Sequence, residues 1–211
     1  MKKALIVFVK APVPGTVKTR LQPHIAPDKI VKLYKTFITE IISKSVRLKG
    51  VDIFLGCTPT KNDEFLREIS SAYKTKRFNQ RGKNLHEKIL NAFRYCLKKS
   101  YSEIILIGSD SPTIPVDFIK KAFINLKKSD LVIGPCFDQG LYLIGTKKGK
   151  TNEIFRNIEL DTGRDVTTIL TRMNSLNIRL SMLPFWYDVD TVDDLRFLDS
   201  HRKYLNRVKI C

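Results

Sequence analysis

Short apolar runs alternate with longer amphipathic segments along most of the chain. The apolar runs that are short enough to be buried strands are 4–9, 51–57, 103–108, 130–135, 141–145 and 178–183, with 74–78 as a shorter candidate. Apolar residues at helical spacing predict helices over 28–49, 62–73, 84–99, 117–127, 163–175 and 191–206. Alternating strands and helices predict an α/β fold with a mostly parallel sheet covered on both faces.

One pair of strands breaks this pattern. Residues 130–135 and 141–145 are separated by too few residues for a crossover helix. One of the two is therefore expected to run antiparallel or to lie outside the sheet. The length fits one domain over residues 1–211, a three-layer α/β/α structure around a mixed sheet.

Polar residues mark the starts of several predicted helices. Asn62 is a plausible N-cap for the helix over 62–73, and Asp117 for the helix over 117–127. Thr191 can cap the last helix, whose positive end Asp193 and Asp194 would complement. We therefore interpret these last two carboxylates as structural.

The loop after the first strand has an unusual composition. In the string FVKAPVPGTVKTRL, residues 8–21, the strand is followed by Lys10, Pro12, Pro14, Gly15, Lys18, Thr19 and Arg20. Proline fixes the loop in advance, glycine permits a positive φ, and the cationic side chains can bind phosphate. The pattern indicates an anion-binding loop, although a stiff basic surface turn is also consistent with it.

Two acidic motifs follow other strands. Ser109 and Asp110 directly follow the apolar run 103–108. A carboxylate in this position packs poorly and is a natural Mg²⁺ ligand. Asp188 and Asp190 alternate around a valine and share one face of an extended chain. Ligands of open α/β sheets bind beyond the carboxyl ends of the strands, so a cationic loop and two acidic points are expected to meet there.

Composition narrows the class of protein. The formal net charge of +17 favours anionic partners, although many of the lysines are scattered as on any solvated surface. Cys57, Cys96, Cys136 and Cys211 have neither CxxC spacing nor a histidine cluster, which fits reduced thiols better than disulfides or zinc. No apolar stretch approaches a membrane span, and the sequence predicts a cytoplasmic protein.

The motifs resemble a known family. FVKAPVPGTVKTRL, LIGSDSPTIP, GPCFDQGLYLIG and LPFWYDVDTVDDL are similar, in order over nearly the whole chain, to motifs of the GT-A-fold family called selenodomain-associated transferase 1. Its relatives include phospholactate and molybdenum-cofactor guanylyltransferases and CMP-sugar synthetases. The resemblance implies that Gly15, Lys18 and Arg20 hold nucleotide phosphates. It implies that Asp110 and Asp190 hold Mg²⁺ or Mn²⁺, and we add Asp188 as a third metal candidate.

The sequence departs from the family pattern at two places. The family's D-G-G-Y is replaced here by Asp138, Gln139, Gly140, Leu141 and Tyr142, so an acceptor pocket formed by these residues would differ. The slip of the aromatic residue is expected to change the face that Tyr142 occupies. Around 79–89 the family tends toward Q-x-G-x-D-L-G-E-R, which leaves Gln80 and Glu87 as weaker candidates near the nucleotide and puts His86 in place of glycine.

Other polar residues have simpler explanations. His86 reads as a surface residue at a helix start, and His24 and His201 as surface residues without partners. In the segment 160–170, Asp161 or Thr162 as a helix cap accounts for the polar residues, and Arg164 facing an acidic acceptor is the lesser alternative.

The leading hypothesis is a Mg²⁺-dependent nucleotidyltransferase that moves a nucleotidyl group from an NTP to a small phosphorylated or acidic acceptor. Its reaction would depend on positioning and electrostatics from Lys18, Arg20 and Asp110. The alternative is a glycosyltransferase that uses an NDP-sugar on the same scaffold. A third alternative is a catalytically decayed nucleic-acid-binding or regulatory protein. Nucleic acid is the less favoured partner, because the basic residues do not cluster with interleaved aromatics along the sequence. The sequence carries no sign of an oligomeric state.

Overall fold

The computed structural model describes residues 1–208, so Cys211 lies outside the described part. The strands are β1 (Lys3–Lys10), β2 (Val51–Thr58), β3 (Lys76–Asn79), β4 (Glu103–Ile107), β5 (Leu131–Pro135), β6 (Leu141–Lys147) and β7 (Leu180–Met182). The helices are α1 (Pro27–Ser45), α2 (Glu64–Ala72), α3 (Leu85–Lys98), α4 (Val116–Leu126), α5 (Thr151–Arg156), α6 (Asp165–Ser175) and α7 (Val192–Val208), with a 3₁₀ turn η1 at Thr19–Leu21.

The seven strands of the described residues form one mixed sheet in the order β3-β2-β1-β4-β6-β5-β7. β1 lies parallel to β2 and β4, whereas β6 is antiparallel to both β4 and β5. The expectation that one strand of the pair near 130–145 breaks the parallel pattern is therefore confirmed. The short connection leaves β6 no way to return in the parallel sense.

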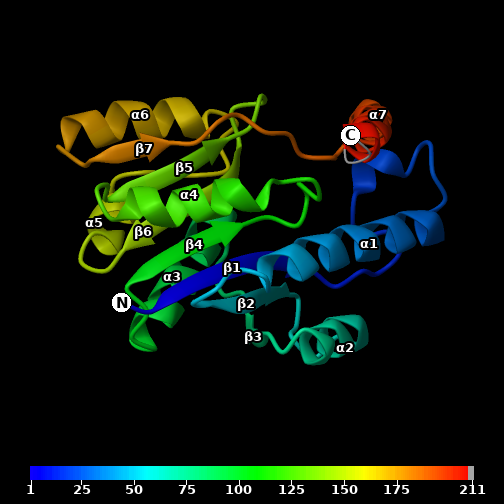
Figure 1. Cartoon of the computed structure of the whole chain (residues 1–211), viewed down its shortest axis with the longest axis horizontal. Helices are drawn as coiled ribbons and strands as arrows, with labels where there is room; N and C mark the ends of the chain where they lie inside the picture. The colour runs from blue at the N-terminus through cyan, green and yellow to red at the C-terminus, as the bar shows by residue number, and fades with distance from the viewer. Residues whose placement is uncertain (209–211) are drawn as a thin grey trace.

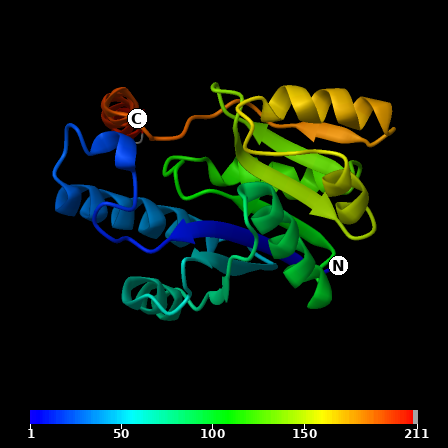
Figure 2. The same cartoon turned by 180° about the vertical axis from the view of Figure 1, so that it is seen from behind.

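Helices cover both faces of the sheet (Figures 1 and 2), as the unbroken apolar runs predict. On one face, α1 and α4 bury their apolar stripes against the sheet, with Phe37 and Phe123 in the core. On the other face, α3, α5 and α6 form a second core that includes Phe93, Phe155 and Ile169. The predicted three-layer α/β/α architecture is confirmed.

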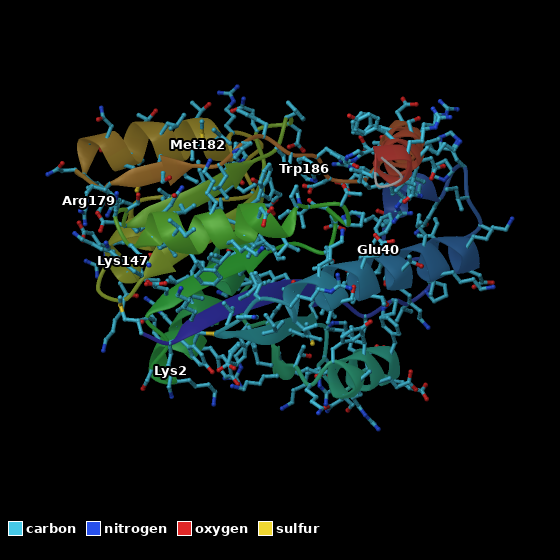
Figure 3. All side chains as sticks on the ribbon, viewed as in Figure 1. Lys2, Glu40, Lys147, Arg179, Met182 and Trp186 are labelled. Carbon is cyan, nitrogen blue, oxygen red and sulfur yellow. The ribbon has the colours of Figure 1, made fainter. Side chains whose placement is uncertain are left out.

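Ion pairs fasten the outer elements. Asp130, at the start of β5, is buried and accepts contacts from Lys147 and Arg179, whose labelled side chains lie at the same end of the sheet (Figure 3). Glu40 of α1 pairs with Arg202 of α7 at 2.6 Å. The last helix is thereby held beside α1, at the end of the sheet where β1 and β4 terminate (Figure 1).

Three of the predicted helix caps are wrong and one is confirmed. At α6 the N-cap is Arg164, so neither Asp161 nor Thr162 caps that helix. Asp63, not Asn62, caps α2, because its carboxylate accepts the Leu66 N–H at 3.0 Å. Helix α4 begins at Val116 after Pro115, which leaves Asp117 inside the first turn, where it pairs with Lys120. Thr191 does cap α7.

Three further features complete the fold. The short α5 lies at 151–156, where no helix was expected from the sequence. Cys57, Cys96 and Cys136 are free and buried, as expected of reduced thiols. No helix within residues 1–208 is long and apolar enough to cross a membrane.

Candidate active site at the carboxyl ends of the strands

The loop after β1 is held by its own backbone and by one buried side chain. Val17 is buried, and Lys10 Nζ donates to the Thr16 carbonyl at 2.6 Å. Gly15 adopts φ 78°, the positive value that glycine permits, and Lys18 adopts the left-handed conformation at φ 46°. A lysine in that region costs roughly 1–2 kcal/mol, which its side-chain contacts must offset.

Those contacts are two carboxylates. Lys18 Nζ lies 2.7 Å from Asp190 Oδ1 and also contacts Asp110 Oδ1. The Lys18 side chain is only 4% exposed, whereas those of Asp110 and Asp190 are 44% and 42% exposed. Burial alone would lower the pKa of the Lys18 ammonium, but Asp110 and Asp190 together outweigh it and raise the pKa above its usual value.

Backbone and hydroxyl contacts hold the two carboxylates in place. The Val189 N–H donates to the Asp110 carbonyl at 2.9 Å, which joins the two acidic motifs directly. The Tyr34 hydroxyl lies 2.8 Å from Ser109 Oγ and accepts the Lys10 N–H at 3.0 Å. Burial, followed by the charge of Asp110, raises the pKa of Tyr34 to about 12, so this phenol stays neutral. Ser109 is buried and acts as an anchor for the strand ends.

Asp188 differs from the other two aspartates. Ser111 Oγ donates to one of its carboxylate oxygens, and the Cys136 thiol lies 3.2 Å from the other. Burial, with the charge of Asp110 adding to it, raises the pKa of Asp188 to about 6. Both oxygens therefore already have donors, unlike the half-exposed carboxylates that face Lys18.

Two adjoining cavities open over these residues. A cavity of about 250 Å³ lies against the cationic loop, and a second of about 410 Å³ extends over the sheet toward β6. Both are lined by Lys10, Tyr34, Asp110 and Asp190. The smaller one adds Lys18, Thr19 and Arg20, and the Arg20 guanidinium lies 4.0 Å from Asp190. A compact cationic compartment thus adjoins a larger and more apolar one.

The residues around 80–87 divide into a lining residue and a helix cap. The Gln80 side-chain amide donates to the Gly56 carbonyl at 2.8 Å and lines the larger cavity. Glu87 accepts the Lys83 N–H at 2.8 Å at the start of α3 and lines neither cavity. Its contacts are those of a capping residue.

The residues that depart from the family pattern lie in the turn between β5 and β6 and at the start of β6. Pro135 pairs with Leu141 and Gly134 with Leu143, so Tyr142 is the extra residue of a β-bulge. Its ring is buried over Gly134, where an added Cβ would lie 2.3 Å from it, and its hydroxyl donates to the Pro184 carbonyl. Gly140 and Tyr142 line the larger cavity.

The neighbouring residues Asp138 and Gln139 have local roles. Gln139 adopts φ 71°, which explains why glycine suits that place in the family pattern. Its side chain accepts the Thr167 hydroxyl at 3.0 Å, and the Asp138 carboxylate accepts the Gly140 N–H at 3.0 Å. Both residues shape the turn and lie outside the lining of the two cavities.

An Asp-Thr-x-x-Asp sequence occurs twice, at 161–165 and 190–194, and its last carboxylate accepts the N–H groups of the first two residues each time. Asp194 accepts the N–H groups of Asp190 and Thr191 at 3.0 and 2.7 Å, which confirms its structural role. Asp165 accepts those of Asp161 and Thr162 at 3.0 and 2.9 Å. In both turns the first residue, Asp161 or Asp190, lines the larger cavity, and Asp190 also pairs with Lys18.

The structure thus gathers most of the predicted site residues. The smaller or larger cavity is lined by Lys10, Lys18, Thr19, Arg20, Gln80, Ser109, Asp110, Gly140, Tyr142, Asp188 and Asp190. Pro14, Gly15, Glu87, Asp138 and Gln139 lie outside the lining. Sequence reasoning missed Tyr34, which the periodic stripe of α1 conceals, and treated Asp161 only as a cap, although the repeated Asp-Thr-x-x-Asp pattern signals its place.

The histidines stand apart from the site. His201 is not the partnerless surface residue that was expected, because its Nδ1 lies 2.7 Å from the Tyr187 hydroxyl and its ring packs on Trp186. His86 packs against Phe155 and lines neither cavity.

The carboxylates that line the cavities fit a divalent cation only as a pair. Residues 1–208 contain no group of three or more His, Cys, Asp or Glu arranged to hold a metal alone. Asp110 and Asp190 nevertheless reach one cation together, the Lys18 ammonium. Mg²⁺ is commonly bound by one or two carboxylates, with waters and substrate phosphates completing its shell. The pair therefore fits a metal that arrives with a phosphorylated ligand.

Comparison with known proteins shows which family and which solved structures the chain resembles. Residues 41–162 match a family model described as "Uncharacterized protein conserved in bacteria (DUF2064)". A solved "putative nucleotide-diphospho-sugar transferase" from Desulfovibrio desulfuricans G20 is 31% identical, with a TM-score of 0.83 over 93% of this chain and 86% of that one. No curated protein sequence matches the chain.

More distant structures share the fold. CMP:2-keto-3-deoxy-manno-octonic acid synthetase complexed with CTP is 10% identical, with a TM-score of 0.60 over 97% of this chain and 99% of that one. Rv0371c complexed with manganese, from Mycobacterium tuberculosis H37Rv, is 14% identical, with a TM-score of 0.54 over 93% and 97%. The fold is that of the nucleotide-diphospho-sugar transferases, and the predicted GT-A-like class is confirmed.

Proposed function

The chain belongs to the DUF2064 family, and from this premise we propose that it is a nucleotidyltransferase that uses Mg²⁺ or Mn²⁺. A transferase is supported by the fold and by the 31% identical relative. The finer proposal is that an NMP group passes from an NTP to a small phosphorylated or acidic acceptor. The two cavities that share Asp110 and Asp190 would receive these substrates.

The observation that carries the proposal is the buried Lys18 ammonium between two half-exposed carboxylates. Carboxylates repel phosphates, so their presence inside a cationic compartment needs a cation that joins the two. Asp110 and Asp190 would hold that metal. When bound, it would withdraw charge from the phosphate oxygens and orient the chain of phosphates.

The chain's own cations would neutralise the remaining charge. Arg20 is largely exposed at the mouth of the smaller cavity and can bind a phosphate through two N–H groups. Lys18 would neutralise charge on the leaving group from within the site. The preformed loop lowers the ordering cost of binding.

In the proposed reaction an anionic oxygen of the acceptor attacks the α-phosphorus. The bond from that phosphorus to the oxygen bridging to the β-phosphorus breaks, and pyrophosphate leaves with the electron pair. No proton has to be removed from an acceptor that is already an anion. Rate enhancement would come from alignment and electrostatic stabilisation.

A glycosyltransferase is the second candidate, favoured by the name of the 31% identical relative, a nucleotide-diphospho-sugar transferase. The same loop and carboxylates would then hold the diphosphate of an NDP-sugar. The bond broken would lie between the anomeric carbon and the diphosphate, and the leaving group would be an NDP.

The leaving group separates the two functions. The first experiment is a thermal-shift panel of the common NTPs and NDP-sugars, each with Mg²⁺, Mn²⁺ or EDTA. Ligand at about 100 times its Kd adds roughly 2.7 kcal/mol of stability. Nucleotidyl transfer predicts a metal-dependent shift with an NTP, followed by pyrophosphate release when candidate acceptors are added. A shift with NDP-sugars alone, followed by NDP release, would overturn it in favour of the alternative.

A further inference from the structure

A third cavity lies away from the site described above. It has a volume of about 550 Å³ and is bordered by the edge strand β3 and helix α3. Its lining is Lys61, Arg77, Phe78, Asn79, Arg81, Asn91, Ala92, Arg94, Tyr95 and Lys98. None of these residues lines either cavity of the candidate active site.

The charge of this cavity is of one sign. Lys61, Arg77, Arg81, Arg94 and Lys98 line it, and the described lining includes no carboxylate. In the described part of the chain, no ion pair involves any of these five cations. Convergent cations without counter-charges raise the local concentration of anions.

Two of the arginines are oriented by neutral oxygens. Arg77 Nη1 donates to the Lys61 carbonyl at 2.8 Å, and Arg94 Nε donates to Asn152 Oδ1 at 3.0 Å. A neutral acceptor fixes the guanidinium without cancelling its charge. The remaining N–H groups of each arginine keep their capacity to bind phosphate.

The floor of the cavity suits a ring. Phe78 and Ala92 are buried, and the rings of Phe78 and Tyr95 stack with centroids 4.5 Å apart and planes 24° from parallel. Asn79 and Asn91 also line the cavity; Asn79 Oδ1 accepts the Lys61 N–H and Asn91 Nδ2 donates to the Arg81 carbonyl, so each amide keeps its other group for a ligand. Phosphate-binding groups, an apolar surface and amides able to pair with a base edge therefore occur in one concavity.

We propose that this cavity is a second anion-binding site that takes a nucleotide, distinct from the candidate active site. Its phosphates would contact Arg77, Arg94 and Lys98, and its base would rest on the floor of Phe78 and Tyr95. The expectation that basic residues do not cluster with aromatics is wrong for this region. Separate segments of the chain, 61, 77–81 and 91–98, come together only in the fold.

The nucleotide can come from two sources with the same chemistry. A free mononucleotide presents its phosphates at one end, whereas a unit of a single-stranded nucleic acid presents a phosphodiester on each side. The cavity is the size of a small-molecule pocket, and the +17 net charge would also attract a strand. The experiment therefore includes both.

The experiment measures binding of ATP and of a ten-nucleotide uridine oligomer to the full chain in EDTA. Three double variants are compared with the wild type: R77Q/R94Q, R81Q/K98Q, and K127Q/K128Q as a control at the end of α4. Loss of two of the cations that line the cavity is expected to weaken ATP binding at least about tenfold in each of the first two variants. The control is expected to change it less than about twofold.

The second double variant guards against misfolding, because within residues 1–208 the side chains of Arg81 and Lys98 make no hydrogen bond or ion pair that would be lost. A further variant, R20Q, marks binding in the active-site cavity. Equal losses in all the double variants would overturn the proposal, since binding would then depend on overall charge. So would ATP binding that falls only in R20Q, or no binding at millimolar ATP. Tighter binding of the oligomer, with a salt slope that falls by about 2 in R77Q/R94Q, identifies a strand as the source.

Discussion

The active-site compartment and the cavity between β3 and α3 are both cationic, but only the first contains carboxylates. In the first, Lys18 is neutralised by Asp110 and Asp190. In the second, Arg77 and Arg94 are held by neutral oxygens and keep their charge. Both are concave. The first lies at the carboxyl ends of β1 and β4, and the second lies beside the edge strand β3.

The difference separates two ways of binding phosphate. Cations without carboxylates bind an anion directly, with an affinity that falls as salt rises. Cations paired with carboxylates favour a phosphate that brings a divalent metal, and an internal ammonium can hold the carboxylates together meanwhile. Metal dependence should therefore belong to the first cavity and salt dependence to the second.

The largest effect is expected from Asp110→Asn. This change removes one charge of the carboxylate pair but keeps the shape of the side chain. Turnover with the NTP that stabilises the wild type should fall at least about 100-fold, the range seen when one electrostatic contact to a transition state is lost. Steady-state product release measures it. Turnover of the variant within about threefold of the wild type would show that the pair is not needed for catalysis.

Lys18→Met tests the internal cation. Without the ammonium, two half-exposed carboxylates face each other, and the free energy of unfolding should fall by about 2 kcal/mol, less than for a fully buried pair. Mg²⁺ should then raise the melting temperature of the variant more than that of the wild type. The raised pKa of Lys18 means that its stabilisation is complete below pH 10.5 and is lost as pH rises through the folded value.

A matched control is Lys76→Met, which breaks an exposed pair with Asp52. It should cost less than about 1 kcal/mol and should not respond to Mg²⁺. Equal responses of the two variants to Mg²⁺ would contradict the role given to Lys18.

Asp188 provides a pH-dependent contrast within the first cavity. Its pKa is raised from 3.8 to about 6, so the folded state binds a proton more tightly than the unfolded state. Stability due to this group is therefore greatest below pH 3.8 and falls as pH rises through 6, by roughly 2–3 kcal/mol in all. Asp188→Asn should remove this loss, so that the variant gains stability relative to the wild type between pH 4 and pH 7. Urea unfolding at the two pH values measures the change, and parallel behaviour of the two proteins would contradict it.

The smallest effect is expected in the second cavity. In the wild type, Asn79 Oδ1 accepts the Lys61 N–H at 2.7 Å. Asn79→Asp keeps an acceptor oxygen at this place and adds a carboxylate among the cations. ATP binding in EDTA should weaken about three- to tenfold, an effect of roughly 1 kcal/mol for one screened charge. Titration calorimetry with and without Mg²⁺ measures it. An unchanged or stronger affinity in EDTA would show that ATP does not bind among these cations.

Local patterns were enough to predict the strands, the cationic loop and the acidic strand ends. The run ALIVFV is buried from both sides, and the short link before β6 forces it antiparallel. Asp110 and Asp190 could be found because a carboxylate after an apolar strand has no packing role.

Contacts between segments that are far apart in the chain could not be predicted from the sequence. Tyr34 sits in the apolar stripe of α1, and only the fold shows that its hydroxyl joins Lys10 to Ser109. The predicted cap of α2 lay one residue too early, at Asn62 and not at Asp63, because hydrophobic periodicity does not fix the end of a helix to a single residue. The basic cavity is built from segments whose approach depends on how β3 pairs with β2 and how α3 packs.

The most direct test of the metal assignment is a titration of the protein with Mn²⁺, in which electron paramagnetic resonance measures the concentration of the free ion. The wild type, Asp190→Asn and Asp193→Asn are compared, with and without the NTP that stabilises the wild type. Asp193 is three residues away, and within residues 1–208 its side chain pairs only with the exposed Arg196. We predict that the wild type and Asp193→Asn bind Mn²⁺ together with the NTP, and that Asp190→Asn binds it at least about tenfold more weakly. Equal Mn²⁺ affinity in all three proteins would contradict a metal site at Asp110 and Asp190.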